Sequence, residues 1–220
     1  MSPNMIHLLI KALGETLYMV ALSAAIASLF GIPLGVILTI TGKGHIKENA
    51  ALHKTLGSIV NALRSVPFII LMVAIIPLTR IIVGSSIGTT AAIVPLTISC
   101  TPFISRIIES SLLEVDNGVV EAAQSMGATP FQIITKVMIP ECLPGLISSM
   151  TTALTTILGY SAMSGVIGGG GLGKIALSYG YYRYQTDIMI VCVILLVLMV
   201  QVFQTVGTFW ATRSDKRLRK

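Results

Sequence analysis

Charged residues are absent from four long stretches of this chain, and that spacing constrains the fold more than any other feature. The uncharged stretches hold 27 residues between Glu15 and Lys43, 25 between Arg80 and Arg106, 32 between Glu141 and Lys174, and 25 between Asp187 and Arg213. A helix needs about 20 apolar residues to cross the hydrocarbon core of a bilayer. Each stretch is therefore long enough for one membrane-spanning helix.

A fifth candidate span lies between Arg64 and Arg80, where only 15 uncharged residues intervene. It reaches spanning length only if the helix starts near Ser58 and Arg64 faces protein or snorkels to the interface. The sequence therefore predicts an all-α polytopic membrane protein with five transmembrane helices, near residues 17–41, 58–79, 87–105, 143–165 and 188–211. The first run is too long for the apolar region of a signal peptide, so we expect it to stay in the membrane.

The distribution of Lys and Arg predicts the orientation of these helices. An odd number of spans places the two termini on opposite sides of the membrane. With the C-terminus inside, ten Lys and Arg residues face the cytoplasm and four face outward, with Arg64 counted on neither side. Because cytoplasmic loops are rich in Lys and Arg, we expect an N-out/C-in topology. Residues 1–16 are then external, 17–211 form the transmembrane domain, and 212–220 form a basic cytoplasmic tail facing the membrane rather than nucleic acid.

Two glycine patterns indicate close packing. The run "GGGGLGK", Gly168–Lys174, matches a dinucleotide-binding pattern and the start of a phosphate-binding loop, but Ile175 stands where Ser or Thr would bind magnesium. The run also follows a predicted span rather than a strand. We therefore interpret it as a non-helical run whose backbone freedom permits close approach of another chain. "GIPLG", Gly31–Gly35, has glycines four residues apart, a spacing typical of close contacts between membrane helices.

No catalytic or metal-binding constellation is evident in the sequence. The cysteines and histidines show no metal-ligand spacing, and the cysteines read as small packing residues. Glu15 and Asp187 lie at predicted span edges, where we expect an acid merely to end a helix. A proton relay needs ionisable groups at mid-membrane depth, so an ion-coupled carrier is disfavoured. The lack of a nucleophile–base pair likewise disfavours an intramembrane enzyme.

A polar module follows the third span. Residues 106–141 form the longest segment that must lie outside the bilayer, on the cytoplasmic side in this topology. A short helix is predicted there, with Glu121 in its first turn complementing the positive end of the helix dipole. Val119, Ala123 and Met126 recur at i, i+4 and i+7 and predict one apolar face.

The end of this helix and the start of the next are also predicted. Gly127 suits the left-handed position after a helix C-terminus, and Thr129 followed by Pro130 is typical of an N-cap and first helical residue. The apolar face of the second helix would consist of Phe131, Ile134 and Met138. Pro140 is expected to close it. The alternative is an interfacial helix pair lying on lipid.

The pattern Glu121-Ala122-Ala123, Gly127, Val137-x-Ile139-Pro140 resembles the "EAA" signature of permease subunits in bacterial ABC importers of the type I fold. Val137 and Ile139 depart conservatively from the usual residues. In that family the segment is the coupling helix, which docks into a cleft on a separate ATPase. The resemblance implies that the ATPase-coupling residues are Val119, Glu121, Ala122, Ala123, Met126, Gly127, Ala128, Thr129 and Pro130.

A narrower resemblance covers nearly the whole chain. Residues 64–80, 86–115 and 159–189 look like the permeases of methionine importers, and the glycine run followed by "YGYYRY" is the most telling part. This resemblance implies a homodimeric permease in the bacterial cell (inner) membrane, working with two ATP-binding subunits and an external substrate-binding lipoprotein. ATP and Mg would bind the partner ATPase, with no cofactor bound by this chain. The alternatives are another small amino acid-like, sulfonate or betaine substrate, or an ion-coupled carrier.

Candidate substrate contacts lie at the end of the fourth span. A thioether and a phenol ring can make polarizable contacts with a methionine side chain, and hydroxyl groups can hold its amino or carboxylate group. The candidates are Tyr160, Ser161, Met163 and Ser164. Ordinary helix packing is the alternative for all four. Arg64 could attract a carboxylate or stabilise a gate, or it could simply snorkel at the end of the second span.

Overall fold

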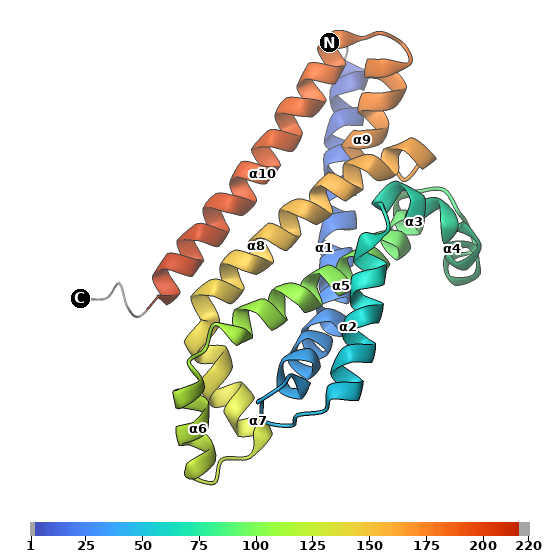
Figure 1. Ribbon diagram of the computed structural model, residues 1–220. Helices are drawn as coiled ribbons and strands as arrows, with labels where there is room; N and C mark the ends of the chain where they lie inside the picture. The colour runs from blue at the N-terminus through green and yellow to red at the C-terminus, as the bar shows by residue number, and fades with distance from the viewer. Residues whose placement is uncertain (1–2, 216–220) are drawn as a thin grey trace. The chain divides into compact units, whose positions relative to one another are not determined.

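In the computed structural model, which describes residues 3–215, every regular element is helical (Figure 1). The α-helices are α1 (Pro3–Thr41), α2 (Ala50–Ser65), α3 (Phe68–Ala74), α4 (Ile76–Val83), α5 (Thr89–Leu113), α6 (Asn117–Ser125), α7 (Pro130–Gln132), α8 (Ile139–Ser164), α9 (Gly171–Ile175) and α10 (Thr186–Ser214). Between them lie the π-helices η1 (Ile133–Met138) and η3 (Ala176–Tyr181) and the 3-10 helix η2 (Gly165–Ile167).

Four helical segments are long and apolar enough to cross a membrane. They are α1, α5, the run Pro130–Ile167 that contains α8, and α10. These segments confirm four of the five predicted spans, although each helix is longer than its predicted apolar stretch. In particular, α1 begins at Pro3 and not near residue 17, because the helical backbone continues through Lys11 and Glu15.

The predicted continuous span 58–79 is wrong. Instead, α2 ends at Ser65, α3 begins at Phe68 after a sharp bend, and a second break at Ile75 separates α3 from α4. Pro67 explains the first break, because a proline disfavours helical geometry in the residue before it and lacks the N–H that would continue the helix. Taken together, α2 and α3 still pass the length and composition test for one broken span.

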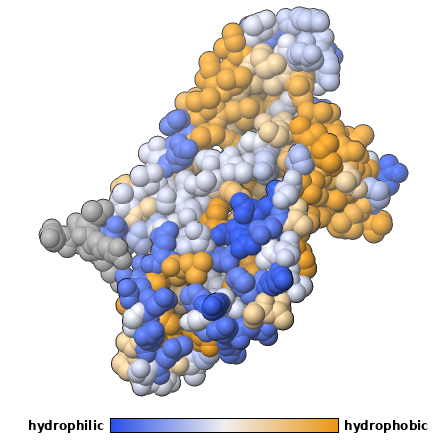
Figure 2. Space-filling view, viewed as in Figure 1, coloured by the Kyte–Doolittle hydropathy of each residue, from blue (hydrophilic) through white to orange (hydrophobic). Residues whose placement is uncertain are grey.

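The chain divides into two compact units, and long helices contribute residues to both. The first unit contains the described residues up to 27, with 66–100 and 154–204. Its core includes Met19 of α1, Phe68 of α3 and Leu96 of α5. Figure 2 shows hydrophobic side chains over α3 and α4, where the exposed apolar residues include Ile70, Ile81 and Ile82.

The second unit contains residues 28–65, 101–153 and the described residues from 205 onward. Here the C-terminal part of α1 packs closely on α5. A Cβ at Gly35 would lie 2.5 Å from the Ser105 carbonyl oxygen, and one at Gly31 would lie 2.9 Å from the Thr101 carbonyl oxygen. The predicted use of these two glycines in a close helix contact is confirmed.

Candidate functional site

The short helix α6 begins one turn earlier than expected. Asp116 is its N-cap, and its Oδ1 accepts a 2.7 Å hydrogen bond from the N–H of Gly118. Since α6 starts at Asn117, Glu121 lies in the middle of the helix and no acidic residue occupies the first turn. The predicted first-turn position of Glu121 is wrong, because Asp116 provides the stronger start signal.

The end of α6 confirms the predicted glycine turn. Gly127 has a φ of +77°, in the left-handed region. The N–H of Ala128 donates to the carbonyl of Ala123 at 3.1 Å, and the N–H of Gly127 donates to that of Gln124 at 2.9 Å. This pair of bonds is a Schellman motif, which satisfies carbonyls that a helix C-terminus otherwise leaves unpaired.

The next helix begins with a capping box. Thr129 is the N-cap and Pro130 the first helical residue, as predicted. The Thr129 hydroxyl accepts the Gln132 N–H at 3.4 Å, and the Gln132 side-chain oxygen accepts the Thr129 N–H at 2.8 Å. Gln132 was not among the predicted capping residues, although Thr-x-x-Gln is a recognisable signal for this motif.

Pro140 does not close that helix, contrary to the prediction. The chain continues from α7 through the π-helix η1 into α8, so Pro140 lies inside one helical run from Pro130 to Ile167. The π-helix ends at Met138, two residues before Pro140. Its wider turn relieves the clash between a proline ring and the carbonyl of the preceding turn.

The buried faces of the module also differ from the predicted ones. α6 packs against η1, and the buried residues are Val120 and Ala123 on α6 with Ile133 and Met138 on η1. Ile133 and Met138 are five residues apart, a spacing that shares one face in a π-helix and not in an α-helix. Ala123 and Met138 belong to the predicted apolar faces and are buried, whereas the buried Val120 and Ile133 were not predicted.

Three side chains of the predicted apolar faces are exposed. Val119, Met126 and Phe131 are 44%, 81% and 74% exposed. In Figure 1, α6 and the stretch that begins at α7 lie side by side, joined by the Gly127 turn. Figure 2 shows mainly hydrophilic residues over this part of the second unit. The module is thus a helix pair with capped ends that presents apolar side chains within a polar surface.

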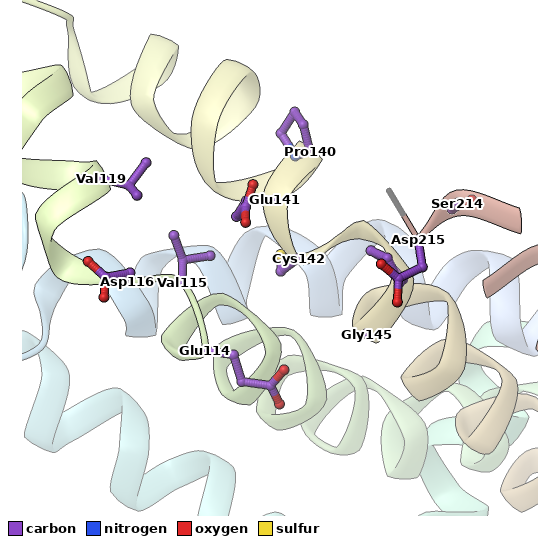
Figure 3. Close-up of a pocket in the computed structure, with 11 residues that line it drawn as sticks. Glu114, Val115, Asp116, Val119, Pro140, Glu141, Cys142, Gly145, Ser214 and Asp215 are labelled. Atoms are coloured by element: carbon purple, nitrogen blue, oxygen red, sulfur yellow. The ribbon is translucent and has the colours of Figure 1, made fainter. Parts of the chain in front are cut away.

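A pocket of about 240 Å³ lies at the base of this module (Figure 3). Four carboxylates are among its lining groups: those of Glu114, Asp116, Glu141 and Asp215. They come from the α5–α6 link, the start of α8 and the chain after α10, segments far apart in sequence. No local pattern could have indicated this acidic pocket in advance.

The four candidate substrate contacts on α8 lie in the first unit. The Tyr160 ring stacks on Phe68 with ring centroids 4.5 Å apart. Ser161 and Ser164 are buried, and their hydroxyls donate to the carbonyls of Leu158 and Ser161, each at 2.7 Å. Met163, by contrast, is 43% exposed.

Arg64 belongs to the second unit, in the last turn of α2. Its guanidinium carbon lies 5.9 Å from the centroid of the Phe103 ring, within the range of a cation–π contact. Arg64 also lines an open groove with Arg106 and Glu109.

The glycine run packs tightly against α1. The N–H of Gly171 donates to Oε2 of Glu15 at 2.8 Å, and the N–H of Leu172 donates to the Thr16 hydroxyl at 2.9 Å. The run thus makes a close contact within its own chain, whereas the sequence predicted close approach of another chain. The expectation that Glu15 merely ends a helix is wrong, since α1 continues past it and its carboxylate holds the loop.

Comparison with known proteins gives a consistent result. The family model described as "Binding-protein-dependent transport system inner membrane component" matches residues 31–220. The probable D-methionine transport system permease protein of Vibrio cholerae is 56% identical, covering 96% of this chain and 93% of that protein. The corresponding protein of Pasteurella multocida is 45% identical, covering 99% and 100%. The D-methionine transport system permease protein of Escherichia coli K12 is 52% identical, covering 75% and 76%.

Solved structures agree with this family. A structure of the MetNI methionine ABC transporter in inward-facing conformations has a TM-score of 0.97 and 47% identity, covering 98% of this chain and 100% of that chain. An amino acid ABC transporter with histidines shares the fold, with a TM-score of 0.78 and 23% identity. The match covers 96% of this chain and 95% of that chain. The predicted all-α permease fold of type I ABC importers is confirmed. The chain belongs to the family of binding-protein-dependent transport system inner membrane components.

Proposed function

We propose that this multi-pass membrane protein is the permease subunit of an ATP-driven methionine importer, taking up the D form, the L form or both. The observation that carries the proposal is identity of 45–56% over nearly the whole chain to permeases named for D-methionine transport. The named relatives are transport permeases, so ATP hydrolysis is assigned to a separate partner subunit.

The proposed assembly has two copies of this chain, two ATP-binding subunits and an external substrate-binding lipoprotein. ATP and Mg bind the ATPase subunits, while this chain provides the pathway. The family description itself names dependence on a binding protein. In this assembly α6 and α7 face the cytoplasm, which corresponds to the N-out/C-in topology.

The module from Val119 to Pro130 is proposed as the ATPase contact. Its caps hold the two helix ends rigidly, and Met126 and Phe131 are the apolar side chains exposed beside the turn. Exposed apolar groups within a polar surface are typical of a protein interface. A rigid element is also required, because a mobile loop would absorb movement of the ATPase instead of transmitting it.

Transport then follows from a two-state equilibrium. ATP can shift that equilibrium only by binding one state more tightly than the other. When the two ATPase subunits close on ATP, they draw the two modules of the dimer together. The helices convert this movement into outward opening, methionine enters from the binding protein, and hydrolysis returns the inward-facing state.

Among the candidate substrate contacts, Met163 and Tyr160 are favoured over the two serines. The hydroxyls of Ser161 and Ser164 already donate to backbone carbonyls within α8. Met163 is exposed and unbranched, and can adapt to a methionine side chain. Arg64 is proposed as a group that attracts the substrate carboxylate.

The decisive experiment measures uptake by the complete transporter in proteoliposomes, with radiolabelled D-methionine, L-methionine, glycine betaine and a small sulfonate. ATP-dependent accumulation of at least one methionine isomer, and of neither control solute, is expected. Accumulation of betaine or the sulfonate without methionine would refute the substrate assignment. Accumulation that persists without ATP and follows an ion gradient would refute the ATP-driven mechanism.

A further inference from the structure

Arg106 joins two helices of the second unit through one guanidinium group. Its Nη1 donates to Oε2 of Glu109 at 2.6 Å, one turn along α5. Its Nη2 donates to the carbonyl of Gly57 at 3.2 Å and to Oδ1 of Asn61 at 2.9 Å, both on α2. The side chain is therefore paired on its own helix and anchored on the neighbouring one.

The surroundings of Arg106 fit this bridge. Glu109 is buried, so its carboxylate depends on a charged partner. The guanidinium lies directly against Gly57, where a Cβ would be at an ordinary contact distance of 3.4 Å from Nη2 of Arg106. A planar guanidinium can donate in several fixed directions at once, whereas a lysine ammonium is a single point charge on a flexible stem.

The bridge lies close to the proposed ATPase contact. α5 ends at Leu113, two turns after Arg106, and the N-cap of α6 is Asp116. The short link between them is held in place, because Val115 is buried and its N–H donates to the carbonyl of Leu112 at 3.3 Å. At its other end, α2 leads into the break at Pro67.

We propose that Arg106 is a positioning residue for transport, which transmits displacement of the α6 module to α2 and so to the broken span. This inference rests on the proposed function. The contact to Asn61 is the part that matters for transmission, while the pair with Glu109 holds the guanidinium in the right orientation. Loss of the bridge would leave the ATPase bound and active but would separate hydrolysis from movement of α2.

The test uses the complete transporter in proteoliposomes and measures methionine uptake per ATP hydrolysed. Asn61→Ala removes one acceptor and leaves the Arg106–Glu109 pair intact. Arg106→Lys keeps the positive charge but loses the planar guanidinium that donates to both helices. Both variants should lower methionine uptake per ATP hydrolysed by at least about fivefold. This value is at the lower end of the coupling factors that are typical between two sites of a protein. Asn61→Asp, which keeps an acceptor oxygen, should retain the wild-type ratio. Arg80→Lys, at an exposed arginine of the first unit, is the matched control.

Two further measurements separate transmission from a merely structural role. The unfolding temperature and the amount of ATPase that co-purifies with the permease should stay at wild-type values in Asn61→Ala. A wild-type uptake ratio in Asn61→Ala or in Arg106→Lys would overturn the inference. So would a loss of uptake in proportion to ATPase activity or to unfolding. Failure of the wild-type chain to bind the ATPase would instead refute the proposed function.

Discussion

At the scale of single residues, the contact between the glycine run and α1 requires glycine for two separate reasons. Gly171 has a φ of +69°, and a Cβ there would lie 2.6 Å from the Thr16 hydroxyl and 2.8 Å from Cε of Met19. Both the left-handed backbone conformation and the lack of room for a Cβ therefore require glycine. The hydrogen bonds that Glu15 and Thr16 accept depend on this close approach.

Gly171→Ala is therefore expected to destabilise the permease by about 2–4 kcal/mol, from left-handed backbone strain and overpacking together. Thermal unfolding in detergent measures the change. Gly14→Ala is the matched control, because a Cβ at Gly14 meets nothing within 4 Å and Gly14 is a helical residue of α1. Equal unfolding temperatures for the two variants would show that the loop does not need the close contact.

At the scale of elements, the residues that stabilise the capped helix pair differ from the residues that it exposes for binding. Its buried residues hold α6 against η1, while Met126 and Phe131 contribute nothing to that core because both are mainly exposed. An interface residue of this kind can be changed without unfolding the permease. The element therefore offers a direct test of the proposed ATPase contact.

The double variant Met126→Ser with Phe131→Ser should weaken ATPase binding at least about tenfold, because exposed anchors often carry much of an interface's binding energy. The unfolding temperature of the isolated permease should stay within a few degrees. Leu52→Ser, a similar change at an exposed apolar position of α2, is the control and should bind normally. Binding is measured by titrating purified ATPase against the permease in nanodiscs, and unchanged affinity of the double variant would contradict the docking assignment.

At the scale of the whole molecule, the open structural question is topology. The proposed orientation places the α6 module inside the cell and the segment around Tyr184 outside. The three native cysteines, at positions 100, 142 and 192, are free and buried, so they should not react with a membrane-impermeant maleimide. Single introduced cysteines can therefore report the side of the membrane directly.

Ser125→Cys should react only in inside-out vesicles, and Tyr184→Cys only in intact cells. Both positions are exposed, so the reagent can reach them once it is on the correct side of the membrane. The reversed labelling pattern would show an N-in/C-out topology. It would also remove the α6 module from the reach of a cytoplasmic ATPase.

The turn between α6 and α7 was predictable from the sequence, whereas the helix boundaries at Asp116 and Pro140 and the buried faces were only partly so. Gly127, Thr129 and Pro130 act through their own backbone preferences, so the turn they form was predicted correctly. The buried pair Ile133 and Met138 depends on a π-helix, which the usual helical period cannot indicate. The bond from Gly171 to Glu15 joins residues 156 positions apart, and no local pattern connects them.

The π-helix η1 also limits how such a permease can change during evolution. It holds about one residue more per turn than an α-helix would. It lies between the helices of the proposed ATPase contact, α6 and α7, and the long helix α8. Winding the same residues as an α-helix, with the chain length unchanged, would rotate everything before them by about 100° relative to α8. Substitutions that keep the wide turn preserve the direction in which Met126 and Phe131 face, whereas substitutions that convert η1 into an α-helix would turn these side chains away from their present direction. The wide turn in this segment should therefore be inherited more strictly than its amino-acid identity.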